Sequence, residues 1–148
     1  MNLRKLLPEA AIIMNLQSNT KKELVAEMVD SLIAAGKIRD REAALSAILE
    51  REKKMSTGMQ HGIAIPHGKT DTVKELVATI ALKPEGAPFE SLDGKPSTIF
   101  IMTLSPLNRA GPHIQFLAEM SQLLNDPERR TTVLQSSNPK ELLDALTA

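Results

Sequence analysis

The amino-acid sequence predicts an α/β fold: a layered sandwich in which a mixed central sheet of about five strands is flanked by helices. Two amphipathic helical patterns come first, short apolar runs occupy the middle, and three further helical patterns follow. Strands in the middle of a chain with helices at both ends are typical of such layered domains. The chain has 148 residues, the size of one domain, so we expect residues 1–148 to fold as a single unit.

The first part of the chain is expected to contain one strand and one helix. The apolar run at residues 10–14 predicts a short strand. Thr20 and Glu23 have capping-box spacing and begin an amphipathic helix that ends near Gly36. Its buried side is predicted to comprise Leu24, Val25, Met28, Val29, Leu32 and Ile33.

The middle of the chain contains a second helix and three further strands. Asp40 is a favourable N-cap for a helix that ends near Lys54. Short strands are predicted at residues 63–65 and 77–82, and a longer one at 98–104. The last run is almost continuously apolar, which predicts a central strand covered on both faces.

Helical patterns occupy the rest of the chain. The first opens at residues 111–113, the second covers 126–134, and the third begins at Asn138, which is followed by Pro and, three positions after the cap, by Glu. The buried stripe of the first of these helices is predicted to be Ile114, Leu117, Met120, Leu123 and Leu124.

Composition excludes several classes of function. The chain has no cysteine, so disulfides, thiol nucleophiles and cysteine-based zinc sites are excluded. It has 18 basic and 18 acidic residues, three Phe and neither Tyr nor Trp, so no nucleic-acid partner is expected. No apolar run approaches the roughly 20 residues of a membrane span, and the N-terminus lacks the apolar core of a signal peptide. We therefore expect a cytoplasmic protein with no membrane span.

The segment Ile65-Pro66-His67-Gly68 is the most informative part of the sequence. The apolar residues before it predict a buried strand that stops at Pro66, because proline has no N–H to donate. Gly68 allows a ligand to approach the backbone closely. His67 is then fixed at its base and open at its tip, as a nucleophile or general base would be. The alternative is a structural histidine that hydrogen-bonds a neighbouring carbonyl.

Two more residues are candidates for the same site. His113 follows Pro112 at the start of a predicted helix, where the positive helix end favours neutral imidazole and a nearby anion. Arg51 lies in a charged run near the end of the second helix. Taken alone, His113 also fits an incidental surface position, and Arg51 also fits a solvated helix face.

A metal site is not expected. His61 and His67 are six positions apart, and an extended segment between them would separate them by about 20 Å. No His-x-x-x-His pair lies on a predicted helix. The prediction is therefore a protein with no metal and no cofactor.

Three motifs, Ser56-Thr57-Gly58, Gly62-Ile63-Ala64-Ile65-Pro66-His67-Gly68 and Gly111-Pro112-His113, stand at characteristic spacings. Together they resemble the enzyme IIA domain of the fructose/mannitol/nitrogen-regulatory class of the bacterial phosphoenolpyruvate-dependent phosphotransferase system. The resemblance covers nearly the whole chain, including Phe89 and the turn at residues 92–96. It departs from the family at His61, a loop position where no histidine is required, and at Ile114, where leucine is more usual.

The resemblance implies a phosphotransferase whose His67 is transiently phosphorylated on a ring nitrogen. It also implies that His113 is the second active-site histidine and Arg51 the active-site arginine. A neutral imidazole can accept a phosphoryl group and pass it on without a metal. Transfer depends mainly on positioning and electrostatic stabilisation, and Arg51 can offer a fork of donors to the phosphoryl oxygens.

By the same resemblance, the donor is the histidine-containing phosphocarrier protein HPr or a nitrogen-branch relative. The acceptor is a cysteine on an enzyme IIB partner, and regulatory protein targets are a further class of partner. Because the chain has no cysteine, IIB and the membrane IIC are expected to be separate polypeptides. Partners are expected to dock on an apolar surface that includes Met59, Ile63 and the loop 106–112.

Two functions remain open at this level. A sugar relay and a nitrogen-type regulatory protein both fit the motifs, and the regulatory or fructose-type subgroup is favoured over the mannitol type. A non-catalytic regulatory binding module on the same fold is the alternative from another class. A hydrolase is not favoured, because no Gly-x-Ser-x-Gly motif occurs.

Overall fold

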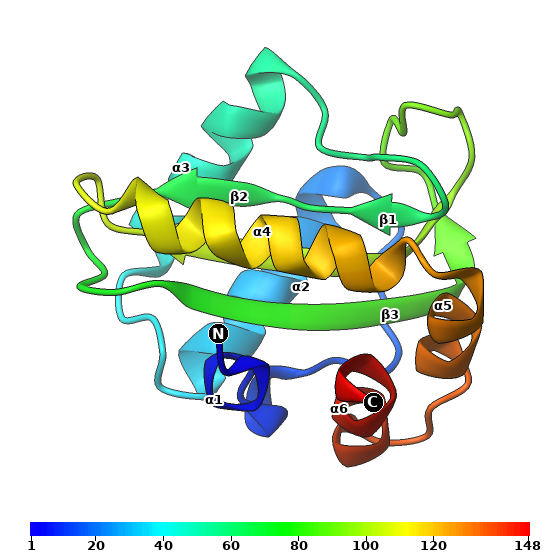
Figure 1. Cartoon of the computed structure of the whole chain (residues 1–148). Helices are drawn as coiled ribbons and strands as arrows, with labels where there is room; N and C mark the ends of the chain where they lie inside the picture. The colour runs from blue at the N-terminus through cyan, green and yellow to red at the C-terminus, as the bar shows by residue number, and fades with distance from the viewer.

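Strand β4 (Ser97–Ser105) lies at the centre of the sheet. In the computed structural model, which describes residues 1–148, β1 (Ile63–Ala64) and β2 (His67–Lys69) pair in parallel with one edge of β4. β3 (Val77–Ala87) pairs antiparallel with the other edge. The sheet is therefore mixed, as predicted, and Figure 1 shows β1 and β2 following one another in line.

The sheet has four strands, and single bridges extend it by one position on each side. Ile13 pairs with Ala81 of β3, and Gly58 pairs with Ala64 of β1. Counting these two bridges, five segments lie side by side across the sheet, which accounts for the prediction of about five strands.

The N-terminal segment differs from the strand predicted at residues 10–14, and that prediction is wrong. Directly after Pro8 the chain turns into a 3₁₀ helix, η1 (Glu9–Ala11), and backbone-to-backbone hydrogen bonds with β3 begin only at Ile13. A short helix, α1 (Leu3–Leu6), precedes this turn. Four residues are too few for apolar periodicity to reveal a helix.

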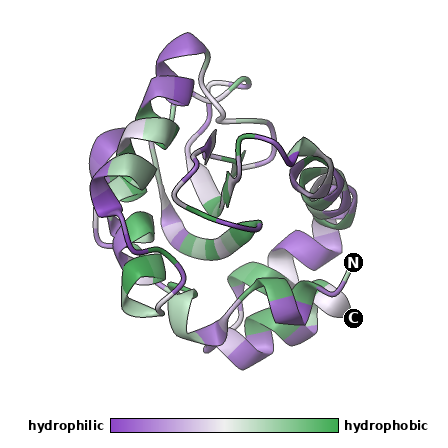
Figure 2. Ribbon diagram, turned by 90° about the vertical axis from the view of Figure 1, so that its left-hand side faces the viewer, coloured by the Kyte–Doolittle hydropathy of each residue, from purple (hydrophilic) through white to green (hydrophobic).

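Helices cover both faces of the sheet. On one face lie α2 (Lys21–Ala34) and α3 (Arg41–Lys54), and on the other lie α4 (Ala110–Leu124), α5 (Pro127–Leu134) and α6 (Pro139–Thr147) together with α1. Hydrophobic residues gather between the layers (Figure 2).

The N-caps predicted for three of the helices are present. In each, the side chain accepts a hydrogen bond from a backbone N–H in the first turn; the residues are Thr20, Asp40 and Asn138. None of the helices is both long and apolar enough to cross a membrane.

Alternate residues of β4 face the two helical layers. Phe100, Met102 and Leu104 pack in the core under α2 and α3, whereas Ile99 and Ile101 pack under α4. All but one of the β4 residues are buried. The prediction of a central strand covered on both faces is therefore confirmed.

β3 is longer than the strand predicted at residues 77–82. Its pairing with β4 shifts register after Leu82 and resumes at Ala87. Pro84 and Glu85 are exposed within this irregular stretch. Proline is tolerated there because an exposed edge at a bulge needs no ladder hydrogen bond from it.

The predicted buried side of α4 is confirmed except at Ile114. Met120 and Leu124 are buried, and Leu117 and Leu123 are partly buried against the same core. The other buried residues of α4 are His113 and Phe116. Ile114, which the sequence predicts to be buried, is 63% exposed. His113 faces β4 because its ring hydrogen-bonds Thr103, and the next residue lies about 100° further round the helix. The exposed Ile114 therefore stands beside the candidate site.

Candidate functional site

His67 begins β2 at the point where pairing along the edge of β4 resumes. The sequence predicts that the strand stops at Pro66, and the structure shows an interruption instead. Pro66 has no N–H, but its carbonyl accepts a hydrogen bond from the Thr103 N–H at 3.2 Å. Pairing then continues, with His67 opposite Thr103. The backbone of His67 is thus held by the central strand.

A single hydrogen bond determines which ring nitrogen of His67 is available. The Nδ1 atom lies 2.8 Å from the carbonyl oxygen of Ile65. A carbonyl can only accept, so Nδ1 carries the proton and donates it. In the neutral ring, Nε2 then holds the free lone pair. The geometry therefore makes Nε2 the nucleophilic atom.

The ring of His113 lies against that of His67. The two ring centroids are 5.0 Å apart, and the ring planes are tilted by 41°. His113 is buried, and its Nδ1 lies 2.9 Å from the Thr103 hydroxyl. Thr103 therefore links the two histidines: its backbone pairs with His67, and its side chain bonds His113.

The surroundings favour the neutral form of both histidines. Burial lowers the pKa of His113 to about 4, with further lowering from the neighbouring His67 and from Lys69. Burial also lowers the pKa of His67; the bond to Ile65 opposes this, and the charge of Arg51 adds to it. Both rings are therefore uncharged at neutral pH, as a nitrogen nucleophile requires.

Arg51 reaches the site from α3 because β2 and α3 pack backbone to backbone at a glycine. A Cβ atom on Gly68 would stand 2.8 Å from the backbone carbon of Ala47, one turn before Arg51. Arg51 donates from Nη1 to the carbonyl of Met55 at 2.8 Å, a contact that involves one of its five N–H groups. Its charge contributes to the lowered pKa of His67. The structure thus brings all three predicted site residues to one edge of the sheet.

A buried carboxylate that the sequence analysis did not single out anchors the end of α3. Glu52 is 7% exposed, and it accepts hydrogen bonds from the backbone N–H of Thr57 at 3.1 Å and from the Thr57 hydroxyl. Lys21 of α2 forms an ion pair with it at 3.0 Å. This network fixes the Ser56-Thr57-Gly58 loop next to Arg51. Glu52 belongs to a charged run that is typical of a solvated face, so its burial was not predicted. The one local signal is Thr57, five positions later, whose hydroxyl can donate to the Glu52 carboxylate.

His61 stands apart from the other histidines. Its φ is 62°, its side chain is exposed, and its backbone N–H bonds the Asp93 carboxylate at 3.2 Å. With Met59 and Ile63 it lines a small groove of about 210 Å³ beside β1. No group of three His, Cys, Asp or Glu side chains is arranged to hold a metal ion.

The sequence of this chain is similar to those of known proteins. The family described as "Phosphoenolpyruvate-dependent sugar phosphotransferase system, EIIA 2" matches residues 5–148. The chain is 35% identical over 146 residues to the fructose-specific EIIABC component of Bacillus subtilis (strain 168), covering 99% of this chain and 23% of that protein. It is 35% identical over 127 residues to the fructose-specific EIIA component of Haloferax volcanii, covering 86% of this chain and 82% of that protein.

Nitrogen regulatory proteins are similar as well. That of Bradyrhizobium diazoefficiens is 30% identical over 128 residues, covering 86% of this chain and 83% of that protein. The crystal structure of nitrogen regulatory protein IIA-Ntr from Neisseria meningitidis superposes with a TM-score of 0.84 at 27% identity, covering 96% of this chain and 97% of that one. Enzyme IIA mannitol of Escherichia coli, in its complex with phosphorylated enzyme IIB mannitol, shares the fold with a TM-score of 0.80 at 24% identity, covering 95% and 96%.

Proposed function

The chain belongs to the EIIA 2 family of the phosphoenolpyruvate-dependent sugar phosphotransferase system, and on this basis we propose that it is a phosphocarrier that accepts a phosphoryl group on Nε2 of His67. The donor is a phosphohistidine of HPr or of a nitrogen-branch relative. The observation that carries the proposal is the bond from Nδ1 to the Ile65 carbonyl, which leaves Nε2 as the free nucleophile. The reaction takes place in the cytoplasm.

The transfer exchanges one phosphorus–nitrogen bond for another. Nε2 of His67 attacks the phosphorus in line, and the bond to the donor imidazole breaks as the new bond forms. The donor nitrogen keeps the electron pair of the broken bond, and Nδ1 of His67 keeps its proton in the bond to Ile65. In the next step a cysteine thiolate of enzyme IIB takes the phosphoryl group and leaves His67 neutral again. Neither step requires a metal or a redox cofactor.

Two neighbouring groups supply electrostatic stabilisation. Negative charge on the three phosphoryl oxygens is met by the guanidinium of Arg51, whose N–H groups form a planar fork. We assign the Thr103 hydroxyl, 2.9 Å from Nδ1 of His113, as the donor in that hydrogen bond. The neutral ring of His113 then carries its proton on Nε2 and donates it to a phosphoryl oxygen. Fixed donors in a partly buried site are the main source of catalysis for this kind of transfer.

Partners dock on apolar side chains carried by the segments that form the site. Leu107 and Ile114, on either side of His113 in the chain, are each 63% exposed. Met55, whose carbonyl accepts from Arg51, is 71% exposed. Of the surface predicted from sequence, Met59 is 40% exposed. Exposed apolar residues around a nucleophile suit brief contacts with successive partners.

We assign the acceptor to a fructose-type enzyme IIB, since fructose-specific relatives reach 35% identity. A nitrogen-type regulatory role is the second candidate. It is favoured by the similarity to IIA-Ntr of Neisseria meningitidis, which extends over almost the full length of both chains. In that role the phosphorylation state of His67 controls binding to other proteins.

The test is intact-mass spectrometry after incubation with phosphoenolpyruvate, enzyme I and HPr at mildly alkaline pH. We expect a gain of one phosphoryl group that is lost on brief acid treatment and is absent from His67→Ala. Circular dichroism of His67→Ala establishes that it is folded. An unmodified wild-type chain with donors that phosphorylate a known enzyme IIA would contradict the proposal and leave a binding module. Addition of a fructose-type IIB then tests the acceptor.

A further inference from the structure

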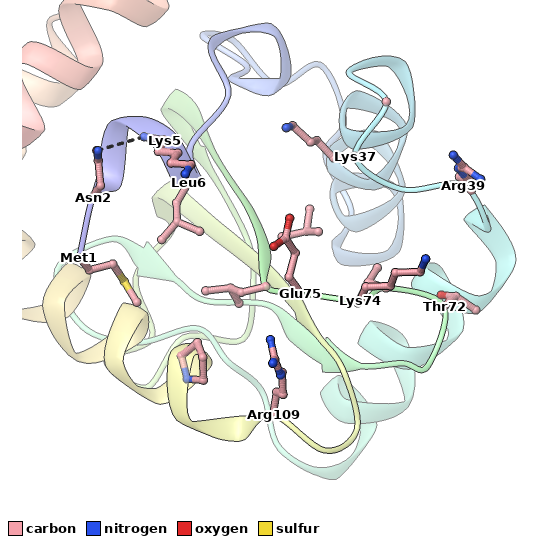
Figure 3. A pocket seen from close by; sticks show the side chains of 15 residues that line it. Met1, Asn2, Lys5, Leu6, Lys37, Arg39, Thr72, Lys74, Glu75 and Arg109 are labelled. Carbon is pink, nitrogen blue, oxygen red and sulfur yellow. Dashed lines mark hydrogen bonds between the residues drawn. The ribbon is translucent and has the colours of Figure 1, made fainter.

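A positively charged groove lies at one end of the sheet, at the start of α4. Its volume is about 830 Å³, and the charged side chains that line it are five basic residues and one acidic residue. They are Lys5, Lys37, Arg39, Lys74, Arg109 and Glu75, and we call this region the basic groove. Figure 3 shows Lys37 and Arg109 on opposite sides of it, with Glu75 between them.

The excess of positive charge is local. Over the whole chain 18 basic and 18 acidic residues balance, yet five of the former and one of the latter line this groove. None of the five basic side chains forms an ion pair or a side-chain hydrogen bond, whereas Arg4 and Arg41, close to them in the sequence, are paired with Asp144 and Asp30. Unpaired charges of one sign around a concave surface focus the electrostatic field and attract a ligand of the opposite sign.

The position in the fold is one where α/β proteins bind ligands. Residues 72–77 follow β2, and Arg109 follows β4, so the groove lies beyond the carboxyl ends of two parallel strands. Ligands of open α/β sheets bind at such an end. The 15-residue helix α4 also begins here, and its N-cap, Arg109, makes no side-chain capping bond. The partial positive charge of this helix end adds to that of the side chains.

The lining indicates the chemistry of the ligand. The cations come from four separate segments: α1, the turn between α2 and α3, the segment before β3, and the start of α4. Convergence of this kind suits a compact ligand with several negative charges. None of the 15 lining residues is aromatic, so a nucleobase would find no ring on which to stack. We propose that the basic groove binds a small, multiply charged phosphate compound.

The groove adjoins the phosphoryl-accepting site at Pro112, which directly precedes His113, but it does not include the side chains assigned to that site. His67, His113 and Arg51 do not line the groove. Binding is therefore expected in the unphosphorylated protein and in variants that cannot accept a phosphoryl group. The proposal stands or fails independently of the role of His67.

The experiment is an NMR titration of the ¹⁵N-labelled chain with inorganic pyrophosphate at low salt, in the Arg51→Ala background to weaken binding at the histidine site. We expect amide shifts at Gly36, Thr72, Val73 and Arg109. The double variant Lys37→Glu/Arg39→Glu should weaken binding by about tenfold or more, because charge-assisted hydrogen bonds are lost. The control Lys22→Glu/Lys140→Glu makes the same change of net charge on exposed lysines of α2 and α6 outside the groove, and it should bind as the parent does.

Each other outcome overturns the proposal. Shifts confined to residues around His67 would mean that pyrophosphate occupies only the histidine site. Equal weakening by Lys22→Glu/Lys140→Glu would mean that only the net charge matters. Absence of shifts up to millimolar pyrophosphate, with salt-sensitive binding of an acidic protein instead, would assign the groove to a macromolecular partner. Heteronuclear spectra of each variant report whether it is folded.

Discussion

The sequence His-Gly occurs twice, at residues 61–62 and again six positions later at residues 67–68. The two pairs have different surroundings. His61 and Gly62 both have positive φ, at 62° and 75°, and form an exposed turn. His67 begins a strand, with its ring held by the Ile65 carbonyl and packed against a second imidazole. A histidine becomes a candidate nucleophile here because a strand fixes its backbone and leaves its side chain only partly exposed.

The two glycines differ in the same way. Gly62 is needed for its backbone conformation, since its φ is one that residues with a Cβ rarely adopt, and a Cβ there would also stand 2.8 Å from the hydroxyl oxygen of the Thr98 side chain. Gly68 is needed for space, since a Cβ there would meet the backbone of α3 at Ala47. One glycine shapes a turn, and the other sets how closely Arg51 approaches His67.

The largest effect on the phosphorylation rate is expected from Arg51, the cationic side chain next to His67. Arg51→Ala should slow phosphorylation of His67 by about 100- to 1,000-fold, as loss of a preorganised donor to developing charge does elsewhere. His61→Ala and Lys53→Ala, an exposed change on the same helix as Arg51, should stay within about twofold. Intact mass against time of mixing gives the rates. If His61→Ala lowered the phosphorylation rate as much as Arg51→Ala, the contrast between His61 and His67 would be wrong.

The pH dependence of stability is expected to come from the buried ring. The folded pKa of His113, about 4, lies below the unfolded value of 6.5, so the unfolded chain binds more protons between these values. Stability therefore falls as pH drops from 6.5 to 4, by up to about 3 kcal/mol from this residue. His67 acts in the same direction because its pKa is also lowered.

Urea denaturation at a series of pH values measures this effect. His113→Gln should flatten the profile between pH 6.5 and 4, whatever its own stability at pH 7. His61→Gln, a change on the exposed turn, should leave the slope as it is. An unchanged slope in His113→Gln would show that the buried imidazole is not the source.

Substitution of the two glycines should separate packing from turn formation. Gly68→Ala should lower the free energy of unfolding by about 2 kcal/mol through overpacking. Gly62→Ala should cost a similar amount, about 1–2 kcal/mol, because of its positive φ and the contact of the new Cβ with the Thr98 side chain, which does not involve α3. Only Gly68→Ala moves α3, so only it should also slow phosphorylation. Denaturation and phosphorylation rates of both variants give the answer, and an equal loss of rate in both would contradict it.

The smallest effect is expected at Thr103, which links the two rings. Thr103→Val removes the hydroxyl that bonds Nδ1 of His113, and phosphorylation should slow by about tenfold, the value of one hydrogen bond of ordinary strength. Thr103→Ser should restore most of the rate. The ¹⁵N shifts of His113 should show a change of tautomer in Thr103→Val alone. Unaltered shifts would assign Thr103 a purely structural role.

Much of the site could be predicted from sequence because its signals are local. The Pro-His-Gly motif, the caps at Thr20, Asp40 and Asn138, and the apolar run of β4 each depend on a few adjacent residues. Family resemblance then joined His67 to His113 and Arg51, which spacing alone does not place together.

The remainder depends on tertiary contacts that no local pattern reports. At the start of α4 the buried position is taken by His113, whose ring bonds Thr103, so the exposure of Ile114 was not predictable from apolar periodicity. Glu52 is buried only because Lys21 and Thr57 pair with it across two elements. The resumption of pairing at His67 likewise depends on Pro66 offering its carbonyl to β4.

The decisive measurement is ¹⁵N–³¹P correlation NMR of the phosphorylated chain, labelled at the histidine ring nitrogens. Because the Ile65 carbonyl holds the proton on Nδ1 of His67, we predict coupling of the phosphorus to Nε2 of His67 alone. Nδ1 should remain protonated in the same spectrum. Coupling to Nδ1 of His67, or to either nitrogen of His61 or His113, would contradict this account of the site.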